Sequence, residues 1–148
     1  AGVSKSTVVY DHKSKSALLE ALIDRRMKIE IERQAQEVAN AKDTQHPELF
    51  GRIKAAEQGI TDAERAVSLA ISASVSQEEK VQQLMRDWTQ EDLAAMAAGP
   101  RPQAALMAYL TLTGVYVTEL FAVHQWGDEE RTKILEGVRT IYSTFPEQ

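Results

Sequence analysis

The sequence predicts an all-α protein, and three observations support that prediction. Strand signals are nearly absent, because no alternating run of β-branched residues is bounded by hairpin turns. Apolar residues instead recur at spacings of three and four along most of the chain, which is the period of a helix with one buried face. Helix-start patterns separate these segments, so we expect roughly seven to nine helices joined by short polar loops.

The first expected helix is short and polar and covers residues 5–12. A long helix follows over residues 16–40, where Leu18, Leu22 and Ile29 lie on one row of its surface. The later helices are placed by local signals: proline at a first helical position, Ser or Thr three residues before Glu or Asp, and glycine at an end. The expected starts are Pro47, Thr61, Ser76, Thr89, Pro102 and Asp128, and the expected ends are Gly59, Val75, Gly99, Gln125 and Phe145.

A chain of 148 residues is long enough for one compact domain with a small appendage. It has no cysteine, which excludes disulfides and thiolate chemistry. The net charge of −5 is distributed unevenly: residues 1–26 contain five Lys or Arg against three acids, so the acidic excess lies in the remainder. A basic head on an acidic body favours contact between the head and nucleic acid while the body is kept away.

The opening residues carry the most informative pattern in the chain. The short helix has hydroxyls, a tyrosine and lysines where a core helix would have leucines, and this composition suits contacts with phosphates and base edges. Gly2 relieves the steric constraint of a tight turn. Ser4 and Ser14 are each placed to cap the start of a helix.

This pattern resembles the second half of the helix-turn-helix of the tetracycline-repressor (TetR) family of transcription regulators. The residues that carry the resemblance are Ala-Gly-Val-Ser at residues 1–4, then Thr7, Tyr10, the Ser-Lys pair at residues 14–15 and the Leu-Leu step at residues 18–19. The resemblance implies that the short helix faces the major groove and adjoining phosphates. The implied DNA-binding residues are Ser4, Lys5, Ser6, Thr7, Tyr10 and Lys15.

The chain departs from the family pattern in three places, one of which is the Val-Val step at residues 8–9, where a one-residue slip would move Tyr10 relative to the pattern. Ser6 stands where many members have glycine, and a His-Lys step at residues 12–13 replaces the aromatic residue before the Ser-Lys pair. The family also places the first helix of the motif before the position of Ala1, so we expect this chain to be a fragment. On this interpretation residues 1–26 are the C-terminal part of a DNA-binding domain, and residues 27–148 form a helical effector-binding and dimerisation domain.

The segment over residues 102–127 contains a single formally charged residue, Glu119. A helix with so little polar surface requires burial on nearly all sides. A membrane span is disfavoured, because threonines, tyrosines and Glu119 interrupt the run and no basic cluster flanks it. Burial within one subunit is an alternative, but the resemblance implies dimerisation through the last two helices. The expected homodimer contacts are Val117, Leu120, Phe121, Ile134, Val138 and Ile141.

The sequence offers no recognisable catalytic or metal motif. His12, His46 and His124 are far apart, and neither a Gly-rich phosphate loop nor a nucleophile elbow occurs. We therefore expect no enzyme, no metal and no cofactor. Bulky flexible residues among the alanines of the central helices favour either plain core or a ligand cavity, and the resemblance implies a cavity. The candidate effector contacts are Phe50, Met85, Trp88, Met96, Met107 and Tyr109.

The expected function is that of a ligand-responsive transcription regulator, a repressor, which acts as a cytoplasmic homodimer. Its expected partners are operator DNA, a second copy of the chain and an unidentified small-molecule effector, with no membrane. The alternative is a non-enzymatic helical interaction module that retains a degenerate DNA-binding head.

Overall fold

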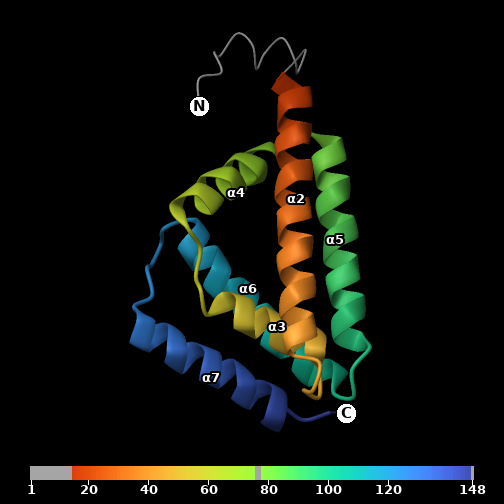
Figure 1. The fold of residues 1–148 in the computed structure, drawn as a ribbon, viewed down its shortest axis with the longest axis vertical. Coiled ribbons are helices and arrows are strands. Elements are labelled where there is room, and N and C mark those ends of the chain that lie inside the picture. Colours follow the sequence, from red (N-terminus) through yellow and green to blue (C-terminus); the bar gives the residue numbers. More distant parts are fainter. Residues whose placement is uncertain (1–14, 76–77, 148) are drawn as a thin grey trace.

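The computed structural model describes residues 15–75 and 78–147, and within these ranges the chain forms six α-helices and no strand (Figure 1). The all-α prediction is therefore confirmed for the described residues. The helix expected over residues 5–12 lies outside them. The helices are α2 (Lys15–Asn40), α3 (Pro47–Ala56), α4 (Asp62–Val75), α5 (Glu79–Ala97), α6 (Pro102–Leu120) and α7 (Asp128–Thr144).

Helix α6 is at the centre of the packing, since it contacts α3, α4, α5 and α7. The long helix α2 runs along the longest axis of the molecule, with α4 near its N-terminal end and α3 near its C-terminal end (Figure 1). Helix α7 lies against α6 and α3 at the same end as the C-terminus. Helix α2 therefore packs mainly against α4 at one end and against α3 at the other.

Buried side chains form two separate clusters. The smaller one joins Ile23 of α2, Ile71 of α4 and Val81 of α5, with Met27 and Met85 packed against it. The larger one lies where α3, α5, α6 and α7 meet. Its buried members are Leu49, Ile53, Met96, Ala104, Ala105, Ala108, Leu112, Leu135, Val138 and Tyr142.

Two predicted helix starts are confirmed in atomic detail. The His46 ring caps α3, because its Nδ1 accepts a hydrogen bond from the Leu49 N–H at 3.2 Å while its Nε2 contacts the Met96 carbonyl at 3.1 Å. The start of α4 is a capping box. Glu64 accepts from the Thr61 N–H at 2.8 Å, and Thr61 Oγ1 accepts from the Glu64 N–H at 3.2 Å.

Two predicted boundaries are wrong. No helix begins at Thr89, because α5 continues through it and the Thr89 hydroxyl donates instead to the Met85 carbonyl one turn earlier, at 2.8 Å. Helix α6 ends at Leu120 rather than Gln125. Ala122 adopts a positive φ of 51°, which a helix cannot accommodate, so the chain turns away at this point.

The backbones of α2 and α3 approach each other closely at Gly51. A Cβ atom at this position would lie 2.8 Å from the Val38 nitrogen and 3.0 Å from the Glu37 carbonyl carbon. Both are backbone atoms, so the contact requires glycine. The C-terminal end of α2 is thereby fixed directly on α3.

No helix in the described ranges has both the length and the apolar character needed to cross a lipid bilayer.

Candidate ligand-binding cavity

A cavity of about 460 Å³ opens between the two buried clusters. All six described helices contribute to its walls. Its volume is within the range of pockets that hold small molecules in other proteins. The cavity is therefore the candidate functional site in the described part of the chain.

Apolar and aromatic side chains form much of the cavity wall. Met27 and Met85 extend the smaller cluster toward the cavity, and Trp88, Tyr109 and Leu112 lie on α5 and α6. Methionine side chains are flexible and adapt to ligands of different shape, whereas the aromatic rings supply rigid surfaces. The wall is thus suited to an apolar guest.

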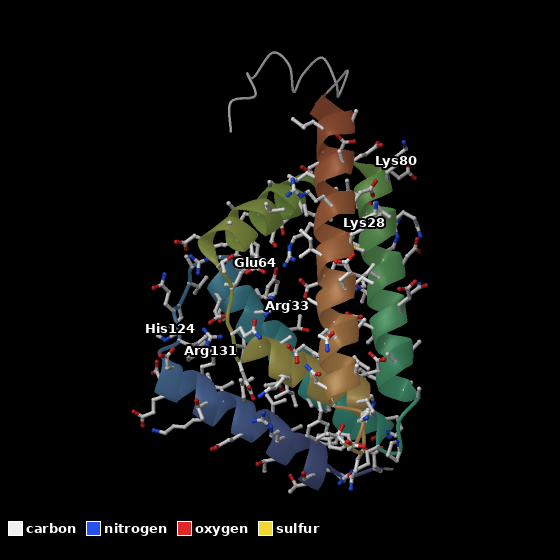
Figure 2. All side chains as sticks on the ribbon, in the orientation of Figure 1. Lys28, Arg33, Glu64, Lys80, His124 and Arg131 are labelled. Carbon is white, nitrogen blue, oxygen red and sulfur yellow. The ribbon has the colours of Figure 1, made fainter. Side chains whose placement is uncertain are left out.

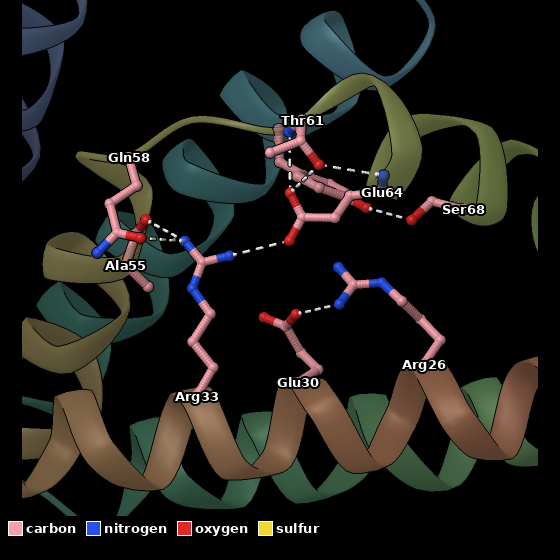
Figure 3. A network of polar contacts seen from close by, with 9 residues as sticks. Arg26, Glu30, Arg33, Ala55, Gln58, Thr61, Glu64 and Ser68 are labelled. Carbon is pink, nitrogen blue, oxygen red and sulfur yellow. Dashed lines mark hydrogen bonds and ion pairs between the residues drawn. The ribbon is translucent and has the colours of Figure 1, made fainter. Parts of the chain in front are cut away.

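Three charged residues of α2 line the cavity on its α4 side. Arg26, Glu30 and Arg33 are spaced by four and three residues, which places them on one face of the helix. Arg26 donates to Glu30 at 2.7 Å (Figure 3). Arg33 reaches across the space between the helices to Glu64 of α4, at 3.3 Å, and also donates to the Ala55 carbonyl at 2.9 Å (Figures 2 and 3). Long side chains, rather than backbone contact, connect α2 to α4 at this point.

Glu64 is held as a carboxylate by its surroundings. Burial pushes its pKa up, but hydrogen bonds from Thr61 and the charges of Arg26 and Arg33 outweigh burial, so the net pKa is below its ordinary value of 4.5. The capping box of α4 and the link to α2 therefore share one charged group.

A second ion pair lies on another wall of the cavity. Arg52 of α3 donates to Asp92 of α5 at 2.5 Å, and the Tyr109 hydroxyl donates to the other oxygen of Asp92 at 2.9 Å. The Arg52 guanidinium also lies over the Tyr109 ring, 5.6 Å from its centroid. Burial, followed by the neighbouring Asp92 charge, raises the pKa of Tyr109 above its ordinary value. Tyr109 therefore stays a neutral hydrogen-bond donor at physiological pH.

The third wall carries an ion pair between Glu119 of α6 and Arg131 of α7. The Glu119 residue is only 5% exposed, which makes it the most deeply buried acid of the cavity wall. Its backbone carbonyl also accepts from Arg65 at 3.1 Å. An unpaired carboxylate would be costly at such a depth, so Arg131 is required there.

The cavity wall is electrically balanced. It contains four arginines and four acids, and each arginine is paired with one of the acids. The pairs are Arg26–Glu30, Arg33–Glu64, Arg52–Asp92 and Arg131–Glu119. The wall accordingly has no net charge to offer a ligand.

Three of the six predicted effector contacts line the cavity, and three do not. Met85, Trp88 and Tyr109 belong to its wall. Met96 is instead fully buried in the larger cluster, and Phe50 packs edge-on against the Tyr142 ring with centroids 5.5 Å apart. Met107 lies outside the wall as well. The sequence analysis did not predict the charged residues of the wall. The helical spacing of Arg26, Glu30 and Arg33, next to Met27, could have indicated a charged face beside an apolar one.

The predicted homodimer contacts divide between the core, the cavity and the surface. Val138 is fully buried within the chain, so its side chain has no surface to offer a partner, and that prediction is wrong. Ile141 packs against the same larger cluster. Leu120, Val117 and Ile134 line the cavity, and Leu120 is buried there. Val117 and Phe121 are the two that are substantially exposed, at 41% and 53%.

The predicted DNA-binding residues lie outside the part of the chain that the structure describes. Ser4, Lys5, Ser6, Thr7 and Tyr10 precede α2, and Lys15 is its first residue, with a side chain that is not described. Within the described ranges, no three His, Cys, Asp or Glu residues gather as a possible metal site.

The fold and the cavity define the class of the protein, an all-α domain whose helices surround a space of ligand size. Residues 51–141 match the family model described as "Tetracyclin repressor-like, C-terminal domain". The match covers more than half of the chain, so the chain belongs to the tetracyclin repressor-like (TetR) family of regulators, whose members are generally not enzymes. Comparisons with curated proteins and with solved structures gave no match.

Proposed function

We propose that the protein is a ligand-responsive repressor of transcription that binds operator DNA as a cytoplasmic homodimer. One observation carries this proposal: α2 forms a wall of the cavity and is continuous toward the N-terminal residues that resemble a recognition helix. In this proposal residues 1–26 belong to the DNA-binding domain, and residues 27–148 bind the effector and the second copy. The DNA contacts are Ser4, Lys5, Ser6, Thr7, Tyr10 and Lys15.

The effector would act by shifting a population of conformers. A small molecule in the cavity favours the arrangement of α2 and α4 that leaves the most room for it, and the two heads of a dimer then no longer match adjacent half-sites. A hundredfold loss of DNA affinity requires roughly 2.7 kcal/mol of differential affinity between the two arrangements. Such a difference is attainable with a few contacts in a cavity of this size.

The proposed dimer face is a row of exposed residues on α6 beside the cavity, which Val117 also lines. Leu110, Gly114, Val117 and Phe121 are spaced by four, three and four residues and therefore lie on one side of the helix. Leu110 and Phe121 are about half exposed, and a Cβ atom on Gly114 would meet no other atom within 4 Å. A second copy could approach α6 closely at this point.

Salt-dependent DNA binding tests the regulator proposal. The complete translated protein should bind DNA from upstream of its own gene, with an affinity that falls steeply as salt rises, because phosphate contacts release counterions. Replacing Lys5 and Lys15 together with alanine should reduce the slope, whereas replacing Lys28 and Lys80 with alanine should not. Absent or salt-insensitive binding would instead favour a helical interaction module with a degenerate head.

Sedimentation velocity tests the dimer face separately. Leu110→Glu should convert the dimer to a monomer, because it places a charge within the proposed interface. Leu93→Glu is the matched control, since Leu93 is an exposed leucine of α5 on a different helix face. If the two variants sediment alike, the α6 row is not the dimer face.

A further inference from the structure

The charge balance of the cavity wall restricts the kind of molecule that it can bind. A ligand carboxylate or phosphate that reached one of the four arginines would lie against the acid already paired with it. The ligand anion would either be repelled by that acid or displace it, and a displaced acid would be left unpaired in a partly buried wall; both outcomes are unfavourable. A ligand cation meets the same obstacle at each acid. An uncharged ligand leaves every pair intact.

Three of the four ion pairs are also held by additional contacts. Glu64 is fixed by Thr61, and Arg33 by the Ala55 carbonyl. Asp92 accepts a second hydrogen bond from Tyr109. Arg131 extends to the Ala56 carbonyl, 3.5 Å away. Breaking any of these pairs disturbs the contact between two helices as well as the pair itself.

We propose that the effector of this cavity is an uncharged, mostly apolar molecule that contacts Met27, Met85, Trp88 and Tyr109 and leaves the four ion pairs in place. The inference rests on the proposed ligand-responsive function and specifies its ligand class. Three of the four ion pairs connect helices, and the apolar surface between the charged residues supplies the affinity.

Two fluorescent probes that share one skeleton test this inference directly. N-phenyl-1-naphthylamine is uncharged, and 8-anilinonaphthalene-1-sulfonate differs from it by a sulfonate. Fluorescence titration of the full 148-residue chain should give one site per chain, with at least tenfold tighter binding of the uncharged probe. Equal or tighter binding of the sulfonate, or no binding of either probe, overturns the proposal.

A variant that fills the cavity shows whether the probes bind there. Ser72 of α4 lines the cavity, so Ser72→Phe should weaken binding of the uncharged probe at least tenfold. Ala70→Phe is the control, because Ala70 is an exposed residue of the same helix and is not part of the wall. Thr89→Phe fills the space from α5 and serves if Ser72→Phe loses its helical circular dichroism. Unchanged binding in the folded filling variant contradicts the assignment.

Altering the charge balance should alter the probe preference. Glu30→Gln leaves Arg26 without its acid, so the ratio of the two affinities should shift toward the sulfonate by roughly fivefold. Arg26→Gln should shift the ratio in the opposite direction, and an unchanged ratio in both variants would refute the role of the charge balance.

None of these titrations contains DNA. A failure of DNA binding with the expected probe preference refutes only the regulator, whereas normal DNA binding with a sulfonate preference refutes only the ligand class.

Discussion

The two ends of α2 are held in different ways. Near its C-terminus the α2 backbone rests directly on α3, where only a glycine fits at position 51. Nearer its N-terminus the helix faces the cavity, and Arg26, Glu30 and Arg33 fill the distance to α4 with long side chains. A contact between backbones has little freedom, whereas a bridge of ion-paired side chains beside an open space can lengthen or tilt. The comparison indicates which end of α2 can respond to an occupied cavity.

The two buried clusters also differ between the two ends of α2. The larger one fixes α3 to α5, α6 and α7, and the smaller one joins α2, α4 and α5 through three buried side chains. The cavity borders the smaller cluster along Ile23 and Ile71. We therefore expect the region around α4 to be the less stable part of the molecule.

The largest expected effect contrasts one isoleucine from each cluster. Ile53 is fully buried in the larger cluster, so Ile53→Ala leaves a closed void and should lower the free energy of unfolding by about 4 kcal/mol. Ile71 already borders the cavity, so Ile71→Ala should cost about 2 kcal/mol. Urea denaturation followed by circular dichroism measures both. Equal losses would mean that the two clusters are packed alike.

The next effect concerns the contact between α2 and α3. Gly51→Ala forces a Cβ atom against the α2 backbone and should destabilise the protein by about 2 kcal/mol. Gly137→Ala is the control, because a Cβ atom on this α7 glycine meets nothing within 4 Å. It should stabilise the helix by about 0.5 kcal/mol through its lower unfolded-state entropy. Thermal melts of the two variants that shift in the same direction would contradict the close approach.

The smallest expected effect is a pH dependence of the free energy of unfolding, caused by the ion-paired residues between α2 and α4. The folded-state pKa of Glu64 is lowered, so its contribution is present above its ordinary pKa of 4.5 and is lost as the pH falls through the lower folded value. At pH 7 Glu64→Gln should cost up to about 1 kcal/mol, and the difference from the unmodified protein should shrink between pH 5 and pH 3. Urea midpoints across this range measure the change.

Glu57 provides the matching test on α3. A hydrogen bond from Lys54, assisted by Arg139, lowers the pKa of Glu57 in the folded state, but these side chains are more exposed than that of Glu64. Glu57→Gln should therefore show the same trend with pH at no more than about 0.5 kcal/mol. If the effect of Glu57→Gln on stability changed more with pH than that of Glu64→Gln, the ion pairs of α2 would not be the more strongly coupled ones.

Local signals made several helix boundaries predictable. The starts at Pro47 and Thr61 depend on residues within one turn, and both form as expected. The same kind of signal at Thr89 failed, because a hydroxyl can bond to the preceding turn of a continuing helix as readily as it can cap a new one. The pattern alone does not distinguish these two uses.

The features that could not be predicted from the sequence depend on contacts between distant segments. Arg33 and Glu64 are 31 residues apart, and their pairing depends on how α4 crosses α2. The apolar stripe of α7 correctly marked a buried face, but Val138 is covered by its own chain rather than by a second copy. Periodicity identifies a face that needs covering and does not identify what covers it.

The length of α2 turns its close contact with α3 into a pivot. From Val38, where it rests on Gly51, to Lys15 the helix extends roughly 35 Å at 1.5 Å per residue. A tilt of about 5° at that fulcrum would carry the far tip sideways by about 3 Å, close to the 3.4 Å rise between stacked base pairs. In the proposed complex with DNA, a rearrangement smaller than one methyl group near the pivot would be magnified into a shift of about one base-pair step.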